Sequence, residues 1–266
     1  MDVLTQGITP QKRLHFDGTR WRTEMSEVVR ELPVTLFVNG REWVTAAVTP
    51  CDLKDWALGF LAGEGLLDSA DRVTVFQWRE DEGQVWLRVP GLQWPDPVGT
   101  ESRYLGSCCG QSRPGFFNPD GVEPLVRDTR FEPDSLQHAF QALSAWSHSQ
   151  HSGGLHAAGA ARGGDLILAR ADVGRHNALD KVFGALLSSG SPVPPDAYIV
   201  FSGRLSAEIV WKVRKMQMAA IVSNAAPTSL GIELAQKLGI TLIGFLRDNE
   251  MSVFANAERL GLEPLV

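Results

Sequence analysis

The second half of the chain alternates short apolar segments with helical patterns, and this alternation restricts the possible fold more than any other feature. Apolar runs of strand length cover 166–169, 198–202, 220–223 and 241–245, and helical spacing covers 177–187, 206–216 and 229–238. A further helix, capped by Asp134 or Ser135, is predicted from apolar residues that share one face, namely Leu136, Phe140, Leu143 and Trp146. Strands that alternate with helices predict a mostly parallel sheet covered on both faces.

The first half predicts a β-rich unit with one early helix. Two hairpins are expected, one from 33–38 and 41–48 around Asn39-Gly40, the other from 72–79 and 84–89. Between them, Thr49-Pro50 predicts a helix start with Thr49 as N-cap and proline in the first turn. Cys51 falls in that turn, where we expect it to pack rather than react.

A long irregular stretch, 90–127, separates the two halves and is rich in Gly, Pro, Ser and Asp. We therefore predict an α/β protein with a β-rich unit at 1–125, which ends in a mobile cysteine loop, and an α/β unit at 126–266.

Charge and cysteine content exclude several classes of protein. There are 25 Lys and Arg against 31 Asp and Glu, a net charge of −6, which disfavours binding to nucleic acid or to an anionic membrane. No 18-residue apolar run is present and the N-terminus lacks an apolar signal core, so we expect a cytoplasmic protein. Three cysteines, two of them adjacent, do not make a disulfide framework, and the six histidines lack metal-ligand spacing.

The adjacent cysteines, Cys108 and Cys109, lie in the segment Gly-Ser-Cys-Cys-Gly-Gln-Ser. A thiol is nucleophilic only as the thiolate, so it needs exposure and nearby positive charge. A glycine-flanked loop provides exposure, and Arg103 and Arg113 are candidates for the charge. The alternative is an incidental loop cysteine.

Two polar segments flank the first predicted strand of the second half. Before it, Gly153-Gly154 precedes His156, which we expect near a helix start, where free N–H groups attract anions; a plain Gly-Gly turn is the alternative. After it comes the run Asp-Val-Gly-Arg-His-Asn-Ala-Leu-Asp-Lys, in which Arg175 suits phosphate or carboxylate and His176 suits proton transfer. The alternative for that run is a capping box with a salt bridge from Asp180 or Lys181.

Similar polar groups follow the later strands. They are Ser202 and Arg204 with Glu208 and Lys212, then Thr228 with Ser229, and finally the stretch Phe245, Leu246, Arg247, Asp248, Asn249 and Glu250. Ligands of α/β sheets collect at the carboxyl ends of strands, so this rim predicts a site for a phosphorylated, nucleotide-like ligand. Neither a Walker A nor a GxGxxG motif is present, which argues against an ordinary ATPase or dehydrogenase.

Taken together, these segments resemble the formate dehydrogenase accessory sulfurtransferase family (FdhD). The resemblance extends over nearly the whole chain and is carried above all by DVGRHNALDK, with GGLHAA before it and SGRLS after it. It implies a cytidine-deaminase-like three-layer α/β/α core without the deaminase's zinc, and a homodimer.

The resemblance also implies a function. A member of this family is a sulfurtransferase that accepts sulfur from a cysteine desulfurase as a cysteine persulfide. It passes that sulfur to the molybdenum cofactor, bis(molybdopterin guanine dinucleotide), before the cofactor enters the catalytic subunit of formate dehydrogenase. On this chain the resemblance assigns the persulfide to Cys109 and cofactor binding to residues 245–250.

The chain departs from the family pattern at the reactive loop, which reads Cys-Gly-x-Cys-Gly in the family. Ser112 stands in place of the second cysteine, and Cys108 is an additional neighbour with a possible auxiliary role. Two alternatives therefore stay open: a cofactor-binding chaperone that transfers no sulfur, and a guanine-nucleotide-binding or nucleoside-modifying enzyme. The second lacks the zinc ligands of such deaminases.

Overall fold

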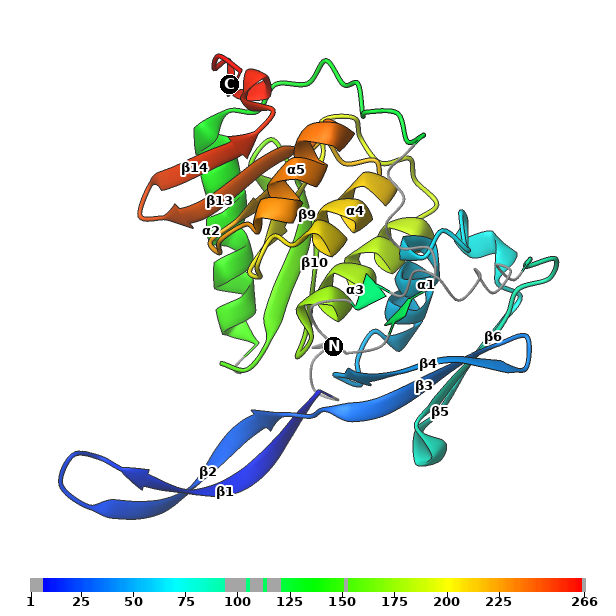
Figure 1. The fold of residues 1–266 in the computed structure, drawn as a ribbon. Helices are drawn as coiled ribbons and strands as arrows, with labels where there is room; N and C mark the ends of the chain where they lie inside the picture. The colour runs from blue at the N-terminus through cyan, green and yellow to red at the C-terminus, as the bar shows by residue number, and fades with distance from the viewer. Residues whose placement is uncertain (1–6, 94–103, 106–111, 114–120, 151–152, 265–266) are drawn as a thin grey trace.

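A six-stranded sheet organises the second half of the chain, with the strand order β10-β9-β11-β12-β13-β14 (Figure 1). The computed structural model describes residues 7–93, 104–105, 112–113, 121–150 and 153–264. The strands of this sheet are β9 (His156–Arg162), β10 (Asp165–Asp172), β11 (Tyr198–Phe201), β12 (Ala220–Ser223), β13 (Thr241–Arg247) and β14 (Glu250–Ala255). The pairs β11–β12 and β12–β13 are parallel, whereas β9–β10, β9–β11 and β13–β14 are antiparallel.

The sheet is therefore mixed, and the expectation of a mostly parallel sheet was wrong. The physical reason is that two of its connections are tight turns rather than helical crossovers. Gly163 and Gly164, both at positive φ, reverse the chain between β9 and β10, and Asp248 and Asn249 do so between β13 and β14.

Helices cover both faces of this sheet, which confirms the predicted three-layer α/β arrangement. On one face lies α2 (Pro133–Ser149), whose buried Leu136 and Leu143 pack in the same core as Val200 and Val222. The other face is covered by α3 (Arg175–Ser188), α4 (Ala207–Lys215) and α5 (Ser229–Leu238) (Figure 1). The start of α2 differs slightly from expectation, because Glu132 rather than Asp134 or Ser135 is its N-cap.

The first half forms a smaller four-stranded sheet of order β4-β3-β6-β5. Its strands are β3 (Leu32–Val38), β4 (Arg41–Val48), β5 (Val75–Arg79) and β6 (Gln84–Arg88), which confirms both predicted hairpins. Asn39 and Gly40 both have positive φ, the geometry of a two-residue type I′ turn. Short 3-10 turns, Ala70–Arg72 and Glu80–Glu82, flank β5, and a third, Ala257–Leu260, follows β14.

Helix α1 (Leu53–Gly63) joins this sheet to the rest of the protein by packing against α3. The two helix backbones touch: a Cβ atom on Gly59 would lie 1.8 Å from the Asp180 carbonyl oxygen, and one on Gly184 would lie 1.8 Å from that of Asp55. One hydrophobic core consequently contains residues from both halves, for example Trp56 and Leu179. The division at 125/126 stays a prediction.

The predicted start of this helix was wrong. Thr49 and Cys51 precede α1, and Asp52 in the left-handed conformation is its N-cap. Thr49 does not cap the helix because its polar groups bind residues at the end of β10. Its N–H donates to the Asp172 carboxylate, and its hydroxyl accepts from the Val173 N–H.

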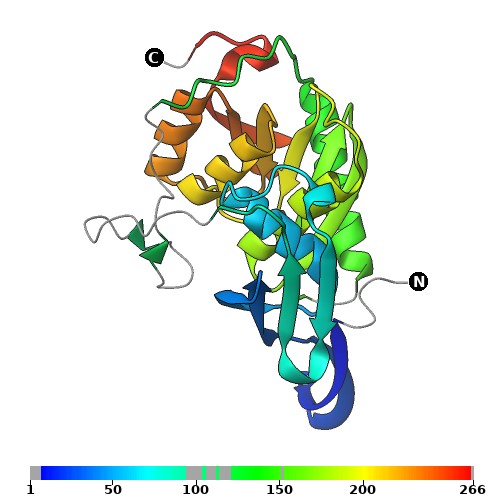
Figure 2. The same cartoon turned by 90° about the vertical axis from the view of Figure 1, so that its right-hand side faces the viewer.

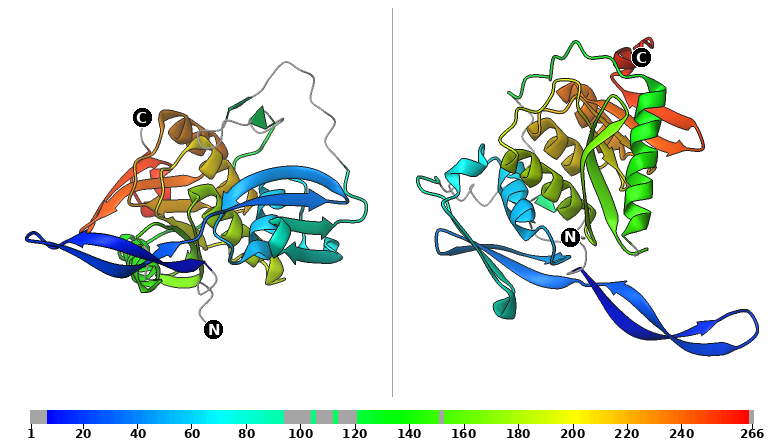
Figure 3. Two further views of the ribbon diagram at one scale, coloured as in Figure 1. Left: turned by 90° about the horizontal axis from the view of Figure 1, so that it is seen from below. Right: turned by 180° about the vertical axis from the view of Figure 1, so that it is seen from behind.

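Two further pairs of strands complete the described structure. At the N-terminus, β1 (Ile8–Phe16) and β2 (Trp21–Val29) form a hairpin that projects away from the body of the protein (Figures 1 and 3). The sequence analysis did not predict this hairpin. The short strands β7 (Tyr104–Leu105) and β8 (Ser112–Arg113) pair with each other beside the body of the protein (Figure 2).

Candidate functional site

The loops that follow β11 and β12 lie side by side and form the centre of the predicted rim. Leu205 bridges to Pro227, its N–H donates to the Ala226 carbonyl, and its own carbonyl accepts from the Thr228 N–H, both at 3.1 Å. Thr228 caps α5, as predicted, because its hydroxyl accepts from the Gly231 N–H at 3.1 Å. The backbone therefore holds two of the predicted polar segments together.

His156 also reaches this edge, but not from a helix. It is the first residue of β9 and lies opposite Asp172 of the neighbouring strand β10. The N–H of the next residue, Ala157, donates to the Ser202 hydroxyl at 2.8 Å. The expected helix start was wrong because the small residues after His156 extend and pair with β10 and β11. The structure nevertheless brings His156 and Ser202 together.

Arg175 begins α3 and lies against the loop after β11. A Cβ atom on Gly203 would lie 3.1 Å from the Arg175 Cβ and 2.8 Å from the Phe201 ring. Glycine at 203 is thus required by close packing, and Arg204, the next residue, is exposed. Two arginines from different elements consequently flank one loop.

His176 and Glu208 form a buried pair behind this loop. The His176 Nε2 lies 3.2 Å from a Glu208 carboxylate oxygen, and His176 is only 7% exposed. Burial lowers the pKa of His176 most, opposed by Glu208 and assisted by Lys212 and Arg175. The imidazole is therefore neutral at neutral pH, a state in which one ring nitrogen donates and the other accepts.

The pKa of His156 is lowered as well, like that of His176. Burial is again the largest cause, followed by the positive charge of Arg175 and by His176, against the opposing effect of Asp172. The rim thus combines the half-buried guanidinium group of Arg175 and the exposed one of Arg204 with imidazoles that resist protonation.

Beneath the rim, two carboxylates of the site region are held in buried ion pairs. Lys181 lies 2.7 Å from Asp172 and Lys212 lies 2.6 Å from Asp180, all with side chains at most 1% exposed. The alternative interpretation of the DVGRHNALDK segment is therefore half correct: Asp180 and Lys181 both form salt bridges, but there is no capping box, because the N-cap of α3 is Gly174 and no side chain of the described residues caps the helix. The salt bridges exist alongside the placement of Arg175 and His176 at the rim rather than instead of it.

The predicted cofactor-binding stretch 245–250 is the hairpin between β13 and β14. Phe245 donates its N–H to the Ala225 carbonyl at 3.3 Å, and an Arg247 guanidinium N–H donates to the Asn224 carbonyl at 3.5 Å. These contacts place 245–247 beside the loop after β12. Leu246 is buried and supports the hairpin, so its contribution is to packing.

The tip of that hairpin lies on the other face of the sheet. Asp248 and Asn249 form its turn at positive φ, and Asn249 accepts a hydrogen bond from the Gln137 side chain of α2. Glu250 opens β14 opposite Arg247. The structure thus joins Phe245 and Arg247 to the rim and gives no contact that brings Asp248, Asn249 or Glu250 to Arg175 or His176.

The cysteines divide into two kinds. Cys51 is buried, with its thiol 3.6 Å from the Lys181 ammonium, and burial raises its pKa, partly offset by Lys181. This confirms the expected packing role. Cys108 and Cys109 lie outside the described residues, and Ser112 belongs to the short strand β8.

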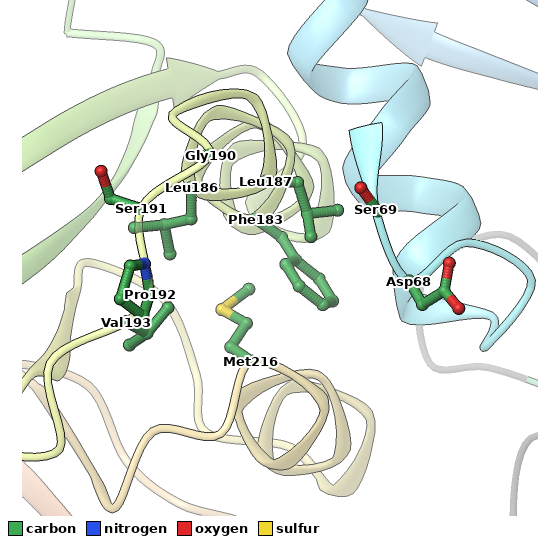
Figure 4. Close-up of a pocket in the computed structure, with 10 residues that line it drawn as sticks. All are labelled: Asp68, Ser69, Phe183, Leu186, Leu187, Gly190, Ser191, Pro192, Val193 and Met216. Carbon is green, nitrogen blue, oxygen red and sulfur yellow. The ribbon is translucent and has the colours of Figure 1, made fainter. Parts of the chain in front are cut away.

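A separate hollow lies at the opposite end of α3 from the rim. It has a volume of about 360 Å³, and Phe183, Leu186 and Met216 line it together with small residues of the 190–193 loop (Figure 4). Asp68 is the one charged residue among those lining it, and none of the predicted site residues reaches it. Over the described residues, no group of three or more His, Cys, Asp or Glu side chains has the arrangement of a metal site, and no helix is long and apolar enough to cross a membrane.

Comparison with known proteins identifies the family. The model of the FdhD/NarQ family matches residues 29–261, which is most of the chain. The chain belongs to the FdhD/NarQ family.

Curated relatives give the same family assignment, and a solved structure shares the fold. The sulfur carrier protein FdhD of Shouchella clausii is 36% identical, over 95% of this chain and 99% of its own. That of Bacillus subtilis is 35% identical, over 90% of this chain and 95% of its own. The crystal structure of a protein from Desulfotalea psychrophila, described as a formate dehydrogenase accessory protein, is 22% identical; it covers 95% of this chain and 99% of its own, with a TM-score of 0.73, and so shares the fold.

Proposed function

We propose that this FdhD/NarQ family member is a sulfurtransferase that carries sulfur as a persulfide on Cys109. The observation that carries the proposal is the state of Cys51, whose burial and raised pKa are the opposite of what a reactive thiol needs. Of three cysteines, only Cys108 and Cys109 are left for the role, and the family pattern assigns it to Cys109.

Sulfur is loaded onto Cys109 by exchange between a thiolate and a persulfide. The Cys109 thiolate attacks the outer sulfur of a persulfide on a cysteine desulfurase, a new S–S bond forms on Cys109, and the desulfurase cysteine leaves as a thiolate. Atoms and electrons balance without an added oxidant. The second step passes this sulfur to the molybdenum cofactor, which is the substrate and not a resident group. The S–S bond breaks, Cys109 leaves as a thiolate, and the outer sulfur is reduced by two electrons to sulfide; a reduced metal in the cofactor or a thiol reductant supplies them.

The rim supports the recognition of that substrate. Bis(molybdopterin guanine dinucleotide) carries four phosphate groups, and guanidinium groups bind phosphate through paired, charge-assisted hydrogen bonds. Arg175, Arg204 and Arg247 come from three different elements around the paired loops, which suits a ligand with several separated phosphates. His156 and His176, both kept neutral, suit hydrogen bonding to its uncharged groups.

The proposal also names the protein partners and the cellular compartment. Sulfur arrives from a cysteine desulfurase, the sulfurated cofactor leaves for the catalytic subunit of formate dehydrogenase, and two copies of the chain act together in the cytoplasm. The names of the relatives, sulfur carrier protein, and of the structural neighbour, formate dehydrogenase accessory protein, support the carriage of sulfur and the link to formate dehydrogenase.

The test is maturation of formate dehydrogenase in a bacterial host that lacks its own family member. Cys109→Ala is expected to abolish formate dehydrogenase activity, whereas Cys51→Ala, a matched loss of one thiol, is expected to retain it. Full activity with Cys109→Ala, together with loss of activity in Cys108→Ala, would assign the carrier to the other cysteine.

A second candidate function is delivery of the cofactor without sulfur transfer. Ser112 in place of the family's second cysteine favours it, because a relay between two thiols of that pair is unavailable. This candidate predicts that a chain with both Cys108→Ala and Cys109→Ala still supports maturation, and an inactive double variant would exclude it.

A further inference from the structure

The N-terminal hairpin forms an arm, residues 7–30, that projects from the body of the protein (Figure 3). Its two nine-residue strands pair along their whole length, from Ile8 opposite Val29 to Phe16 opposite Trp21. At the base, the Arg30 N–H donates to the Gly7 carbonyl at 2.8 Å and closes the hairpin. The arm lies almost entirely before residues 29–261, the part of the chain that the family model matches.

The two faces of the arm differ in character. Alternation along the strands places Leu14, Phe16, Trp21 and Met25 on one face, where they are 68%, 49%, 66% and 58% exposed. The other face carries charges that pair within the arm, Arg13 with Glu24 at 2.6 Å and Arg22 with Asp17 at 2.7 Å. These charged side chains therefore have ion-pair partners within the arm, whereas the four apolar side chains are in contact with water.

Such an arm is not expected to be stable uncovered. A two-stranded hairpin alone is at best marginally stable in water, and a contiguous exposed apolar patch marks an interaction surface. Within the part of the chain that the structure describes, each arm strand has only the other as its sheet partner.

We propose that the arm clasps a second copy of this chain, each arm packing its apolar face on the body of the other copy. The inference deepens the two-copy assembly proposed above, and its test does not involve sulfur transfer.

Area argues for this reciprocal exchange over packing of one arm on the other. Nine residues extend about 30 Å, and two strands with their side chains are about 10–15 Å wide, so one face offers roughly 300–450 Å². Arm against arm would bury about 600–900 Å² in total, less than the roughly 1,200 Å² at which stable interfaces begin. Two arms, each against a body, bury about 1,200–1,800 Å², which is enough.

Charge argues for the body of another copy as the surface that receives the arm. The arm has five Lys and Arg against three Asp and Glu, a net charge of +2, which leaves 20 against 28, or −8, in the rest of the chain. Opposite net charges favour encounter of an arm with a body, whereas two arms repel each other.

Sedimentation velocity at micromolar concentration tests the proposal. The wild type is expected to sediment as a dimer, and a Leu14→Glu/Trp21→Glu variant as a monomer, with a dissociation constant raised at least 100-fold. The matched control, Gln11→Glu/His15→Glu, adds two negative charges to the polar face of the same arm and is expected to remain dimeric. A monomeric wild type, or an apolar-face variant that dimerises as the wild type does, would overturn the proposal.

A mixing experiment separates the two arrangements. Combined with tagged wild type, the apolar-face variant is expected to form mixed pairs of intermediate strength, because the intact arm still reaches the variant's unchanged body. Absence of mixed pairs would indicate arm-on-arm packing and would overturn the exchange. Sulfur loading of Cys109, measured separately, shows whether the proposed function fails while the assembly holds.

Discussion

The Lys181 ammonium lies 2.7 Å from the Asp172 carboxylate, and neither side chain has exposed surface. Lys181 also donates to the carbonyls of Thr49 and Ala171, at 3.0 and 3.2 Å, and the same carboxylate oxygen of Asp172 accepts from the Thr49 N–H. The pair thus ties the end of β10, the middle of α3 and the segment before α1 into one buried polar network.

Removing one member of this pair is expected to be costly. Lys181→Met leaves the Asp172 carboxylate buried without its partner, which should lower the free energy of unfolding by about 3–5 kcal/mol. Chemical denaturation measures this, with the exposed Lys54→Met as a control that should change stability by less than about 0.5 kcal/mol. If Lys181→Met proved as stable as the control, the pair would not hold these elements together.

The contact of α1 with α3 predicts a sharp difference between two glycines of one helix. Gly59→Ala places a methyl group 1.8 Å from the Asp180 carbonyl oxygen, so the helices must separate, and we expect a loss of about 3 kcal/mol or more. Gly63→Ala meets nothing closer than 3.5 Å and should be neutral or stabilising by up to about 1 kcal/mol. Equal melting temperatures for the two variants would contradict the observed packing.

The lowered pKa of His176 predicts how stability changes with pH. The unfolded chain takes up a proton near pH 6.5, whereas folded His176 resists protonation because it is buried. The free energy of unfolding should therefore fall as the pH drops from about 7.5 to 5.5, by at most about 1.4 kcal/mol per pH unit from this residue.

Denaturant titrations at several pH values check the contribution of His176. His176→Gln, which stays neutral, should reduce the slope of unfolding free energy against pH, while His138→Gln on the exposed side of α2 serves as the comparison. An unchanged slope in His176→Gln would mean that the imidazole is as easily protonated in the folded state as in the unfolded chain.

The arginine rim predicts binding of guanine nucleotides. With guanosine diphosphate as the probe, Arg175→Gln or Arg204→Gln should weaken binding by about 10–100-fold, as expected for one charged hydrogen-bonded contact of about 1.5–3 kcal/mol. Isothermal titration calorimetry measures this, and Arg88→Gln, on an exposed position of the small sheet, should bind as the wild type does. Similar affinities for all three variants would place the nucleotide site elsewhere.

Much of the fold could be predicted because its signals are local. Asn39-Gly40 determines a hairpin turn by itself, and the apolar stripe of Leu136 and Leu143 determines the buried face of α2. The errors arose where a distant partner decides the outcome. Thr49 would cap a helix if it were alone, but Asp172, 123 residues later, binds its N–H.

The site was predictable to the same extent. Its position at strand ends follows from alternation of strands and helices, so the gathering of Arg175, His176, Ser202 and Arg204 at one edge of the sheet could be expected, while their role stays a prediction. A Gly-Gly turn can precede either a helix or a strand, so the sequence around His156 does not distinguish the two. The residues after His156 form a strand because they pair with β10 and β11. No local pattern reveals that Lys181 and Lys212 are fully buried, because their charge suggests solvent exposure and only the facing carboxylates permit burial.

The central claim, that Cys109 carries sulfur, is tested most directly by intact-mass spectrometry. Wild type, Cys109→Ala, Cys108→Ala and Cys51→Ala are each incubated with a cysteine desulfurase and cysteine, then compared with and without a reductant. We expect the wild type, Cys108→Ala and Cys51→Ala to gain the mass of one sulfur atom that the reductant removes, and Cys109→Ala to gain none. A wild type that stays unloaded beside a competent desulfurase, or a Cys109→Ala variant that loads as the wild type does, would contradict the account.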